Sequence, residues 1–297
     1  MRRTIDTATV IVVVGASSGI GRAAVHRFAE RGAEAIAVRT DVTEPGALDR
    51  LVEAAVDRFG GIDVWVAAAS VFGYGAIDRM PAEIARTIID TNVHGTIDGV
   101  RAALPELRKR RGVVVIVGSV FSGLASPEVW AYVTSKHAVA GFAASIRQEL
   151  RRGPEPVDVA MVWPATVDTP IYQHAANFTG RAVHPIPPLV HPDRVARAIV
   201  RIAARPRQRR IVGVVQGMAV PLHAVAPAPA DRLLAVAMRV FGIRGIRATD
   251  RDGTVSIPDP SSNRIDGGWR HSRVVVLVAL AVGIGAVGVV VRRRSRA

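Results

Sequence analysis

Three side chains near the middle of the chain have the types and spacing of an acid/base site. Ser119 follows an apolar run from Val113 to Val117, and Tyr132 and Lys136 stand four residues apart further on. On a helix, residues four apart share a face, so we expect the phenol and the ammonium side by side. A neighbouring ammonium favours the phenolate, which predicts a pKa for Tyr132 below its ordinary value. The trio predicts proton transfer to or from an alcohol or carbonyl oxygen.

Composition supports this interpretation and excludes some others. The chain has only three tyrosines and two lysines, Lys109 and Lys136, so a tyrosine and a lysine at helical spacing are unlikely to coincide by chance. It has no cysteine, which excludes disulfides and thiolate metal sites. The net charge is +14, but aromatic residues make up only 5% and are not interleaved with the arginines. We therefore expect no nucleic-acid partner.

Alternating strands and helices must position these residues. Continuous Val/Ile runs are typical of parallel strands buried on both faces. The expected strands are 10–14, 34–39, 62–68, 113–117, 157–163 and 211–215. The expected helices are 19–31, 45–59, 81–111 with an interruption near Asn92 and Gly95, a helix through Tyr132 to about 152, and 193–204. This order predicts an α/β fold with a doubly wound parallel sheet, the Rossmann type, in residues 1–226.

A glycine-rich loop joins the first expected strand to the first helix. Its sequence is Gly15-Ala16-Ser17-Ser18-Gly19-Ile20-Gly21. Glycines allow close backbone approach to a phosphate, and a helix N-terminus offers free N–H groups and the positive end of the helix dipole. The loop therefore predicts a dinucleotide site, with a tight structural turn as the alternative.

The C-terminal part has a different composition. Residues 227–272 contain an amphipathic segment, 233–241, followed by a polar stretch that predicts a disordered linker. Residues 273–291 include eighteen consecutive uncharged residues and precede a basic tail, 292–297. This pattern predicts a transmembrane helix, with the catalytic domain in the cytoplasm, and a buried core helix is the alternative.

With the glycine loop, Ser119, Tyr132 and Lys136 assembled, the chain resembles the short-chain dehydrogenase/reductase family over about residues 8–215. Further matches are the position of Asn92, the pair Asp41-Val42, and Pro164, Val167 and Thr169 in the segment after the family's sixth strand. The resemblance implies an NAD(P)-dependent oxidoreductase, and in addition the homo-oligomers common in the family.

The resemblance also implies roles for individual residues. Tyr132 would exchange a proton with the substrate oxygen, which Ser119 would hold in place. Lys136 would bind the nicotinamide ribose and lower the pKa of Tyr132, and Asn92 would position a water molecule in the proton relay. The glycine loop, Asp41 and Val42 would bind the rest of the cofactor.

Two departures from the family pattern stand out. Gly15 and Asp41 are only 26 residues apart, so about one βα unit is absent and strand 34–39 would lie directly beside the first strand. Arg39 would then reach the adenosine ribose, which favours NADP(H) over NAD(H). The family's Asn-Asn-Ala-Gly is Ala67-Ala68-Ala69-Ser70 here, and the lost amides would weaken cofactor binding or stability.

The segment Ile171–Leu189 is expected to be the substrate lid. Its apolar composition favours a small lipophilic alcohol or ketone, which a membrane tether would suit. His174, His184 and His191 lack the spacing of a metal site, so we expect no metal. The alternative hypothesis is a non-catalytic Rossmann-domain relative that acts as a membrane-tethered binding protein.

Overall fold

A parallel five-stranded sheet forms the centre of the computed structural model, which describes residues 4–33, 36–257 and 263–271. Its strand order is β1-β2-β4-β5-β8. The strands are β1 (Ile11–Val14), β2 (Val64–Ala67), β4 (Val113–Val117), β5 (Asp158–Pro164) and β8 (Arg209–Val212). Every residue of β2 and β4 is buried, as their continuous apolar runs predict for central strands covered on both faces. The Rossmann-like α/β fold expected from the sequence is thus confirmed.

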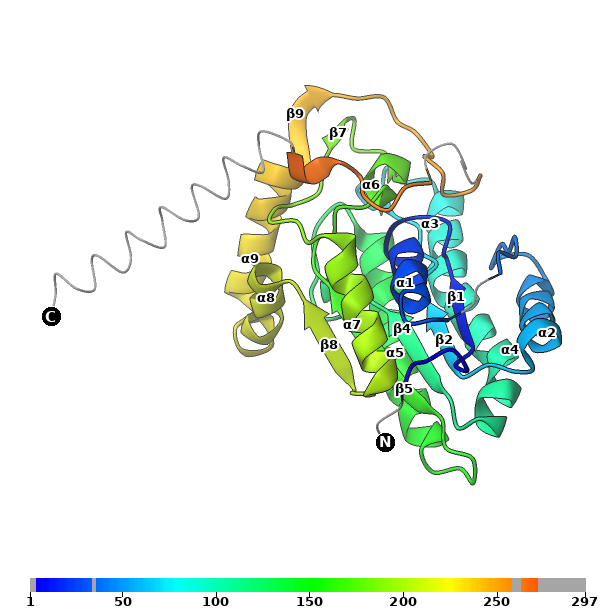
Figure 1. The fold of residues 1–297 in the computed structure, drawn as a ribbon. Coiled ribbons are helices and arrows are strands. Elements are labelled where there is room, and N and C mark those ends of the chain that lie inside the picture. Colours follow the sequence, from blue (N-terminus) through cyan, green and yellow to red (C-terminus); the bar gives the residue numbers. More distant parts are fainter. Residues whose placement is uncertain (1–3, 34–35, 258–262, 272–297) are drawn as a thin grey trace, which may run out of the picture.

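Helices cover both faces of the sheet (Figure 1). On one face α1 (Gly19–Ala29) packs against α7 (Pro192–Ala204). On the other lie α4 (Gly95–Lys109) and α5 (Trp130–Leu150). The helix α2 (Ala47–Phe59) packs against α4, and α3 (Ala82–Ile89) packs against α5.

The expected interruption near Asn92 is a π-helical turn, η1 (Asp90–His94), between α3 and α4. The Thr96 hydroxyl donates to the Asn92 carbonyl at 2.8 Å within this turn. Gly95 follows it because a Cβ there would lie 2.5 Å from a methyl group of Val42. The turn therefore lets the segment before α2 pack closely against the start of α4.

The expected strand 34–39 is wrong over the residues that the structure describes. Residues 36–39 have no regular secondary structure, and within the described chain β1 pairs only with β2. Ile36 and Val38 are 44% and 37% exposed. The physical reason is that α2 packs beside α4 rather than over this segment, so no helix buries an outer strand here.

The C-terminal part folds back over the carboxyl ends of the strands, including residues 247–257 and 263–269 of the stretch 247–269 that was expected to be a disordered linker. Two helices and a π-turn come first, α8 (Val214–Val225), α9 (Pro227–Ala237) and η3 (Met238–Gly242). The strand β9 (Ile243–Arg247) then pairs antiparallel with β7 (Arg181–Val183), and η5 (Trp269–His271) ends the described chain. The remaining short elements are β3 (Gly73–Tyr74), η2 (Val120–Ser122), α6 (Ile171–His174) and β6 (Ala176–Asn177).

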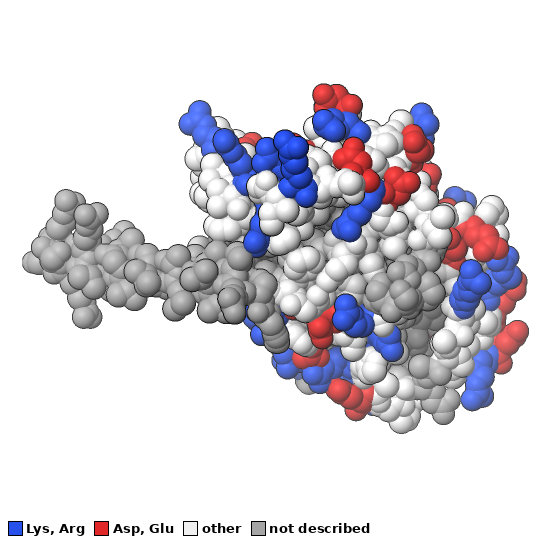
Figure 2. Space-filling model, turned by 90° about the horizontal axis from the view of Figure 1, so that it is seen from above, with Lys and Arg blue, Asp and Glu red and all other residues white. Residues whose placement is uncertain are grey.

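The prediction of a membrane protein is corrected as well. Among the described residues, no helix has both the length and the apolar character needed to cross a bilayer. The expected span, 273–291, lies outside the described residues. On the face seen in Figure 2, the charged side chains of described residues lie mainly around the rim, and both basic and acidic groups are present.

Candidate active site

A cavity of about 1590 Å³ opens at the carboxyl ends of the parallel strands. This is the edge at which ligands bind in open α/β sheets. The cavity brings together most residues singled out from the sequence, namely Gly15, Ser17, Ser18, Gly19, Ile20, Gly21, Arg39, Asp41, Val42, Ser119, Tyr132, Lys136, Pro164, Val167 and Thr169. Asn92 is fully buried and is not among the lining residues. The acid/base trio and the glycine loop therefore share one space.

Tyr132 and Lys136 lie on the same face of α5, as their spacing predicts, and are only 8% and 3% exposed. The Lys136 ammonium lies 5.4 Å from the centre of the Tyr132 ring and donates to the Val117 carbonyl at 3.3 Å. Burial lowers the pKa of Lys136 to about 8. Lys136 is thus a desolvated ammonium beside the phenol.

The pKa of Tyr132 differs in direction from the prediction. Burial raises it to about 12, and the hydroxyls of Ser119 and Ser70, which face the phenol, lower it only in part. Removal from water disfavours the phenolate more than these two donors favour it. In this structure Tyr132 is a protonated phenol, and hydroxyl groups rather than Lys136 oppose the effect of burial.

Ser119 is held at the end of β4 by a reciprocal pair of hydrogen bonds. Its hydroxyl accepts from the Phe121 amide at 3.2 Å, and its own amide donates to the Ser122 hydroxyl at 3.2 Å. This arrangement is the capping box of the short helix η2. Ser122 thereby fixes the backbone of Ser119.

Asn92 joins two walls of the site from behind. Its Oδ1 accepts from the Val71 amide at 2.8 Å, while its Nδ2 donates to the Val71 carbonyl and to the Ser135 hydroxyl, each at 3.0 Å. The Ser135 hydroxyl donates in turn to the Tyr132 carbonyl at 2.7 Å. Asn92 therefore ties the segment after β2 to the helix that carries the phenol. Its expected role in positioning a water molecule stays a prediction.

The glycine loop has the close packing that a phosphate cradle requires. Gly15 has φ +83°, and a Cβ there would lie 2.4 Å from the Ala69 nitrogen. A Cβ on Gly21 would lie 2.1 Å from the Gly15 carbonyl oxygen. Thr169 sits at the same loop, because its side chain is the nearest neighbour of the Gly19 Cβ position. Side chains are thus excluded where a diphosphate would approach the N-terminus of α1.

One loop amide is already bonded within the chain. The Gly19 N–H donates to the Arg264 carbonyl at 2.8 Å, and an Arg22 guanidinium N–H donates to the Asn263 carbonyl at 2.6 Å. We call residues 263–271 the C-terminal strap. A cofactor phosphate that needs the Gly19 N–H must displace this contact.

Asp168 anchors the C-terminal strap. Its buried carboxylate accepts from the backbone amides of Gly267, Trp269 and Arg270 at 3.1, 2.9 and 3.1 Å. Gln173 on α6 adds a hydrogen bond to the Gly267 carbonyl at 2.6 Å. These contacts explain why a polar stretch without periodicity is ordered: acceptors and donors far away in the sequence satisfy its backbone.

The adenosine end of the cavity is open by comparison. Arg39 and Asp41 line it but are exposed. The Asp41 carboxylate accepts from the amide and the hydroxyl of Thr43, at 2.9 and 2.7 Å, and so closes a local turn. Val42 packs against Gly95. The structure brings all three expected residues to the cavity, although on a loop rather than at the end of a strand.

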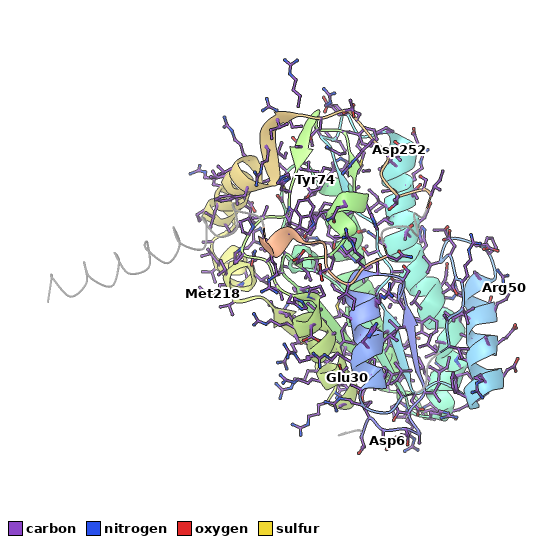
Figure 3. The ribbon with its side chains drawn as sticks, turned by 45° about the horizontal axis from the view of Figure 1, so that its top comes forward. Asp6, Glu30, Arg50, Tyr74, Met218 and Asp252 are labelled. Carbon is purple, nitrogen blue, oxygen red and sulfur yellow. The ribbon has the colours of Figure 1, made fainter. Side chains whose placement is uncertain are left out.

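Aromatic rings surround the phenol on the side away from the glycine loop. The centre of the Phe72 ring lies 4.3 Å from that of Tyr132 and 5.9 Å from that of Tyr172. Tyr74, labelled in Figure 3, lies inside the upper part of the molecule, and its ring centre is 4.8 Å from that of Phe72. Of the three histidines weighed as metal ligands, His191 caps α7, since its Nδ1 accepts from the Asp193 amide at 3.2 Å.

Sequence reasoning missed three hydroxyl groups, those of Ser70, Ser122 and Ser135. Only Ser70 carried a usable signal, because it follows the carboxyl end of a buried strand, where ligand-contacting residues gather in such sheets. The other two act through backbone atoms of Ser119 and Tyr132, and no spacing rule reveals such contacts.

Comparison with known proteins agrees with this geometry. The family model described as short chain dehydrogenase matches residues 30–179. An uncharacterized oxidoreductase of Bacillus subtilis, YxnA, is 31% identical over 252 residues, which cover 76% of this chain and 71% of that protein. The L-fucose dehydrogenase of Mus musculus is 28% identical over 229 residues, which cover 66% of this chain and 82% of that protein.

Solved structures share the fold. A short chain dehydrogenase from Burkholderia cenocepacia J2315, in complex with NADP, superimposes with a TM-score of 0.65 at 23% identity. The superposition covers 76% of this chain and 96% of that one. At this level of identity the similarity concerns the arrangement of strands and helices.

Proposed function

The chain belongs to the short-chain dehydrogenase family, and on that premise we propose that it is an NADP(H)-dependent oxidoreductase that interconverts a lipophilic alcohol and the corresponding ketone. The observation that carries this proposal is the convergence of Ser119, Tyr132 and Lys136 on the cavity that the glycine loop also lines. When bound, the nicotinamide supplies or accepts the hydride.

The residues present fit such a cofactor. At Gly15 and Gly21 any Cβ would clash with the chain's own backbone, so glycine allows the tight turn that leads into the N-terminus of α1, where a diphosphate would bind. Thr169 would hold the phosphates from the opposite side. Lys136 and Tyr132 would contact the nicotinamide ribose.

This chain's own residues would then move one proton. In ketone reduction Tyr132 donates its phenolic proton to the substrate oxygen, and in alcohol oxidation it takes that proton back. Ser119 donates a hydrogen bond to the same oxygen and keeps it in line with the phenol. Lys136 stabilises the phenolate left behind, because a cation within a few ångströms favours the charged form.

The cavity lining supports the substrate class. Apolar side chains from the segment after β2, the lid and α9 face the same space as the phenol, namely Phe72, Phe121, Tyr172, Ile186, Leu234 and Met238. Apolar pockets with a few polar groups favour ligands with a large hydrophobic surface. The preference for NADP(H) rests on Arg39, a cation at the adenosine end.

Two measurements on the full chain test the proposal. Titration with NADPH and NADH is expected to give saturable binding of both, with NADPH tighter. Loss of NADPH absorbance is then expected with lipophilic ketones and not with sugars or short polar aldehydes. Failure to bind either nucleotide would rule out the oxidoreductase.

A second candidate function is a dinucleotide-binding relative without turnover. The Gly19–Arg264 contact favours it, because the chain itself occupies part of the phosphate cradle. This candidate predicts cofactor binding with no oxidation or reduction of any ketone or alcohol. Tyr132-dependent turnover would exclude it.

A further inference from the structure

Ser70 carries a buried hydroxyl that the chain's own fold does not use. It lies three residues after β2, on the cavity wall, and among the described residues its Oγ makes no hydrogen bond of good geometry. A buried hydroxyl without a partner costs free energy. Such a group on the wall of a cavity indicates a partner that arrives during function.

Ser70 and Tyr132 both line the cavity. The Ser70 hydroxyl is close enough to the phenol to lower the pKa of Tyr132, although the two groups make no hydrogen bond of good geometry. The Ser70 hydroxyl therefore lies near the Tyr132 oxygen and is not held by another hydrogen bond.

The backbone around Ser70 is held firmly. Asn92 bonds both the amide and the carbonyl of Val71, the next residue, and through Ser135 it also bonds to the backbone of Tyr132. One buried amide side chain thus sets the distance between the loop that carries Ser70 and the helix that carries the phenol. The fold itself therefore holds the hydroxyls of Ser70 and Tyr132 near each other.

We propose that Ser70 is a positioning residue for the reaction: its hydroxyl donates a hydrogen bond to the Tyr132 oxygen when the phenolate forms, while the single O–H of Ser119 serves the substrate oxygen. This inference rests on the proposed function and deepens it. Ser70 gives up no proton in the step. The proton leaves Tyr132 for the substrate oxygen, and the negative charge on the phenolate oxygen draws in the Ser70 O–H group.

Because Tyr132 is buried, its phenolate needs hydrogen-bond donors from the protein. Burial disfavours the phenolate. A hydroxyl donor to the phenolate oxygen offsets part of that cost without adding charge. The Ser70 hydroxyl lacks a good acceptor while the phenol is protonated and gains one once the phenolate forms. Its hydrogen bond therefore favours the reacting state.

The test compares Ser70→Ala with Ser126→Ala, a matched control whose hydroxyl lies outside the cavity. In alcohol oxidation, Ser70→Ala is expected to lower kcat about fivefold at neutral pH and to leave the cofactor dissociation constant unchanged. The pH at which kcat for alcohol oxidation rises should move to a higher value, because loss of a donor to the phenolate makes Tyr132 a weaker acid. The melting temperature should stay the same or rise, since a strained hydroxyl is removed.

A readout without turnover separates this inference from the proposed function. With tyrosine labelled at Cζ by carbon-13, the three tyrosines give three signals, and Tyr132→Phe assigns one of them. Ser70→Ala is expected to shift the Tyr132 signal and to leave those of Tyr74 and Tyr172 in place. An unmoved Tyr132 signal would overturn the role of Ser70 even in an active enzyme.

Two further outcomes decide the matter. If Ser70→Ala lowers rate and melting temperature together and leaves the pH dependence of kcat unchanged, Ser70 is structural and the proposal fails. If the wild type lacks Tyr132-dependent turnover but its Tyr132 signal shifts in Ser70→Ala, the proposed function fails while the contact between the two hydroxyls stands.

Discussion

At the acid/base end of the cavity, Ser119, Tyr132 and Lys136 are each at most 8% exposed and are carried by β4 and α5 in the interior of the fold. At the adenosine end, Arg39 and Asp41 lie on an exposed segment without regular structure, beside the sheet-edge strand β1. The proposed catalytic groups take their geometry from the core, whereas the residues expected to bind the cofactor lie on a loop and beside the C-terminal strap.

The difference shows where the missing βα unit has its effect. In the described sheet β1 is the edge strand, and the residues expected at the adenosine end are exposed beyond it. The strands β2, β4 and β5 are paired in register, so the site built on them is complete. A short chain can therefore keep the chemistry and still have weaker cofactor binding.

The largest effect is expected for Tyr132→Phe. It removes the proton donor and adds no bulk, so turnover should fall on the order of 10³-fold. Cofactor binding should stay within about twofold, because the glycine loop is unchanged. Steady-state rates and nucleotide titrations measure both, and surviving turnover would contradict the assignment of the phenol.

Lys136→Met is expected to lower turnover about 10²-fold and to raise stability. The folded-state pKa of Lys136, about 8, lies below its ordinary value because of burial. The unfolded chain therefore binds this proton more tightly, and the cost of burying the charge is full below pH 8. The free energy of unfolding of the wild type should rise as the pH goes from about 8 toward 10.

The methionine variant should lack that rise, because it has no charge to lose. Chemical unfolding at several pH values between about 7 and 9.5 tests this, below the range in which tyrosines titrate. Arg101→Met, which changes an exposed cation on α4, is the control. Equal pH dependence in wild type and Lys136→Met would show that Lys136 is not desolvated.

Asn92→Ala is expected to lower the free energy of unfolding by about 2–3 kcal/mol, because the Val71 amide and carbonyl lose their buried partner. Turnover should also fall, because the helix that carries Tyr132 loses the contact that holds it in position. The control is Thr134→Ala, an exposed position on α5. An unfolding midpoint like that of the wild type would mean that Asn92 does not join the two walls.

Asp168→Ala is expected to release the C-terminal strap, because three backbone amides lose one carboxylate. NADPH should then bind several-fold more tightly, since the Gly19 N–H no longer has a competing acceptor. Limited proteolysis should cut sooner within the C-terminal strap, residues 263–271. The control is Asp266→Ala on the same strap, where the side chain is exposed. Weaker NADPH binding would show instead that the strap helps to hold the cofactor.

The smallest effect is expected for Arg39→Ala. Arg39 is exposed, so its attraction for a 2′-phosphate is screened, and NADPH affinity should fall only about threefold to fivefold. NADH affinity should not change. Arg31→Ala, an exposed position after α1, is the matched control. Equal loss for both nucleotides would remove Arg39 as the source of NADP(H) preference.

Local pattern was enough for the strands and for the trio. The run Val113–Val117 is β4 residue for residue, because an uninterrupted stretch of β-branched residues has few other stable places than a buried strand. Tyr132 and Lys136 share a helix face by spacing alone. Pattern failed at residues 36–39, since an extended apolar segment becomes a strand only where a neighbour pairs with it and a helix covers it.

By itself, the sequence determined the parallel sheet, the glycine loop and the serine, tyrosine and lysine of the acid/base site, because these depend on periodicity and on contacts between near neighbours. Only the tertiary structure decided that the Tyr132 pKa rises to about 12, that Asn92 joins two walls, and that Asp168 draws the C-terminal strap across the glycine loop. Burial and contacts between distant residues set these properties, and neither is encoded in local spacing.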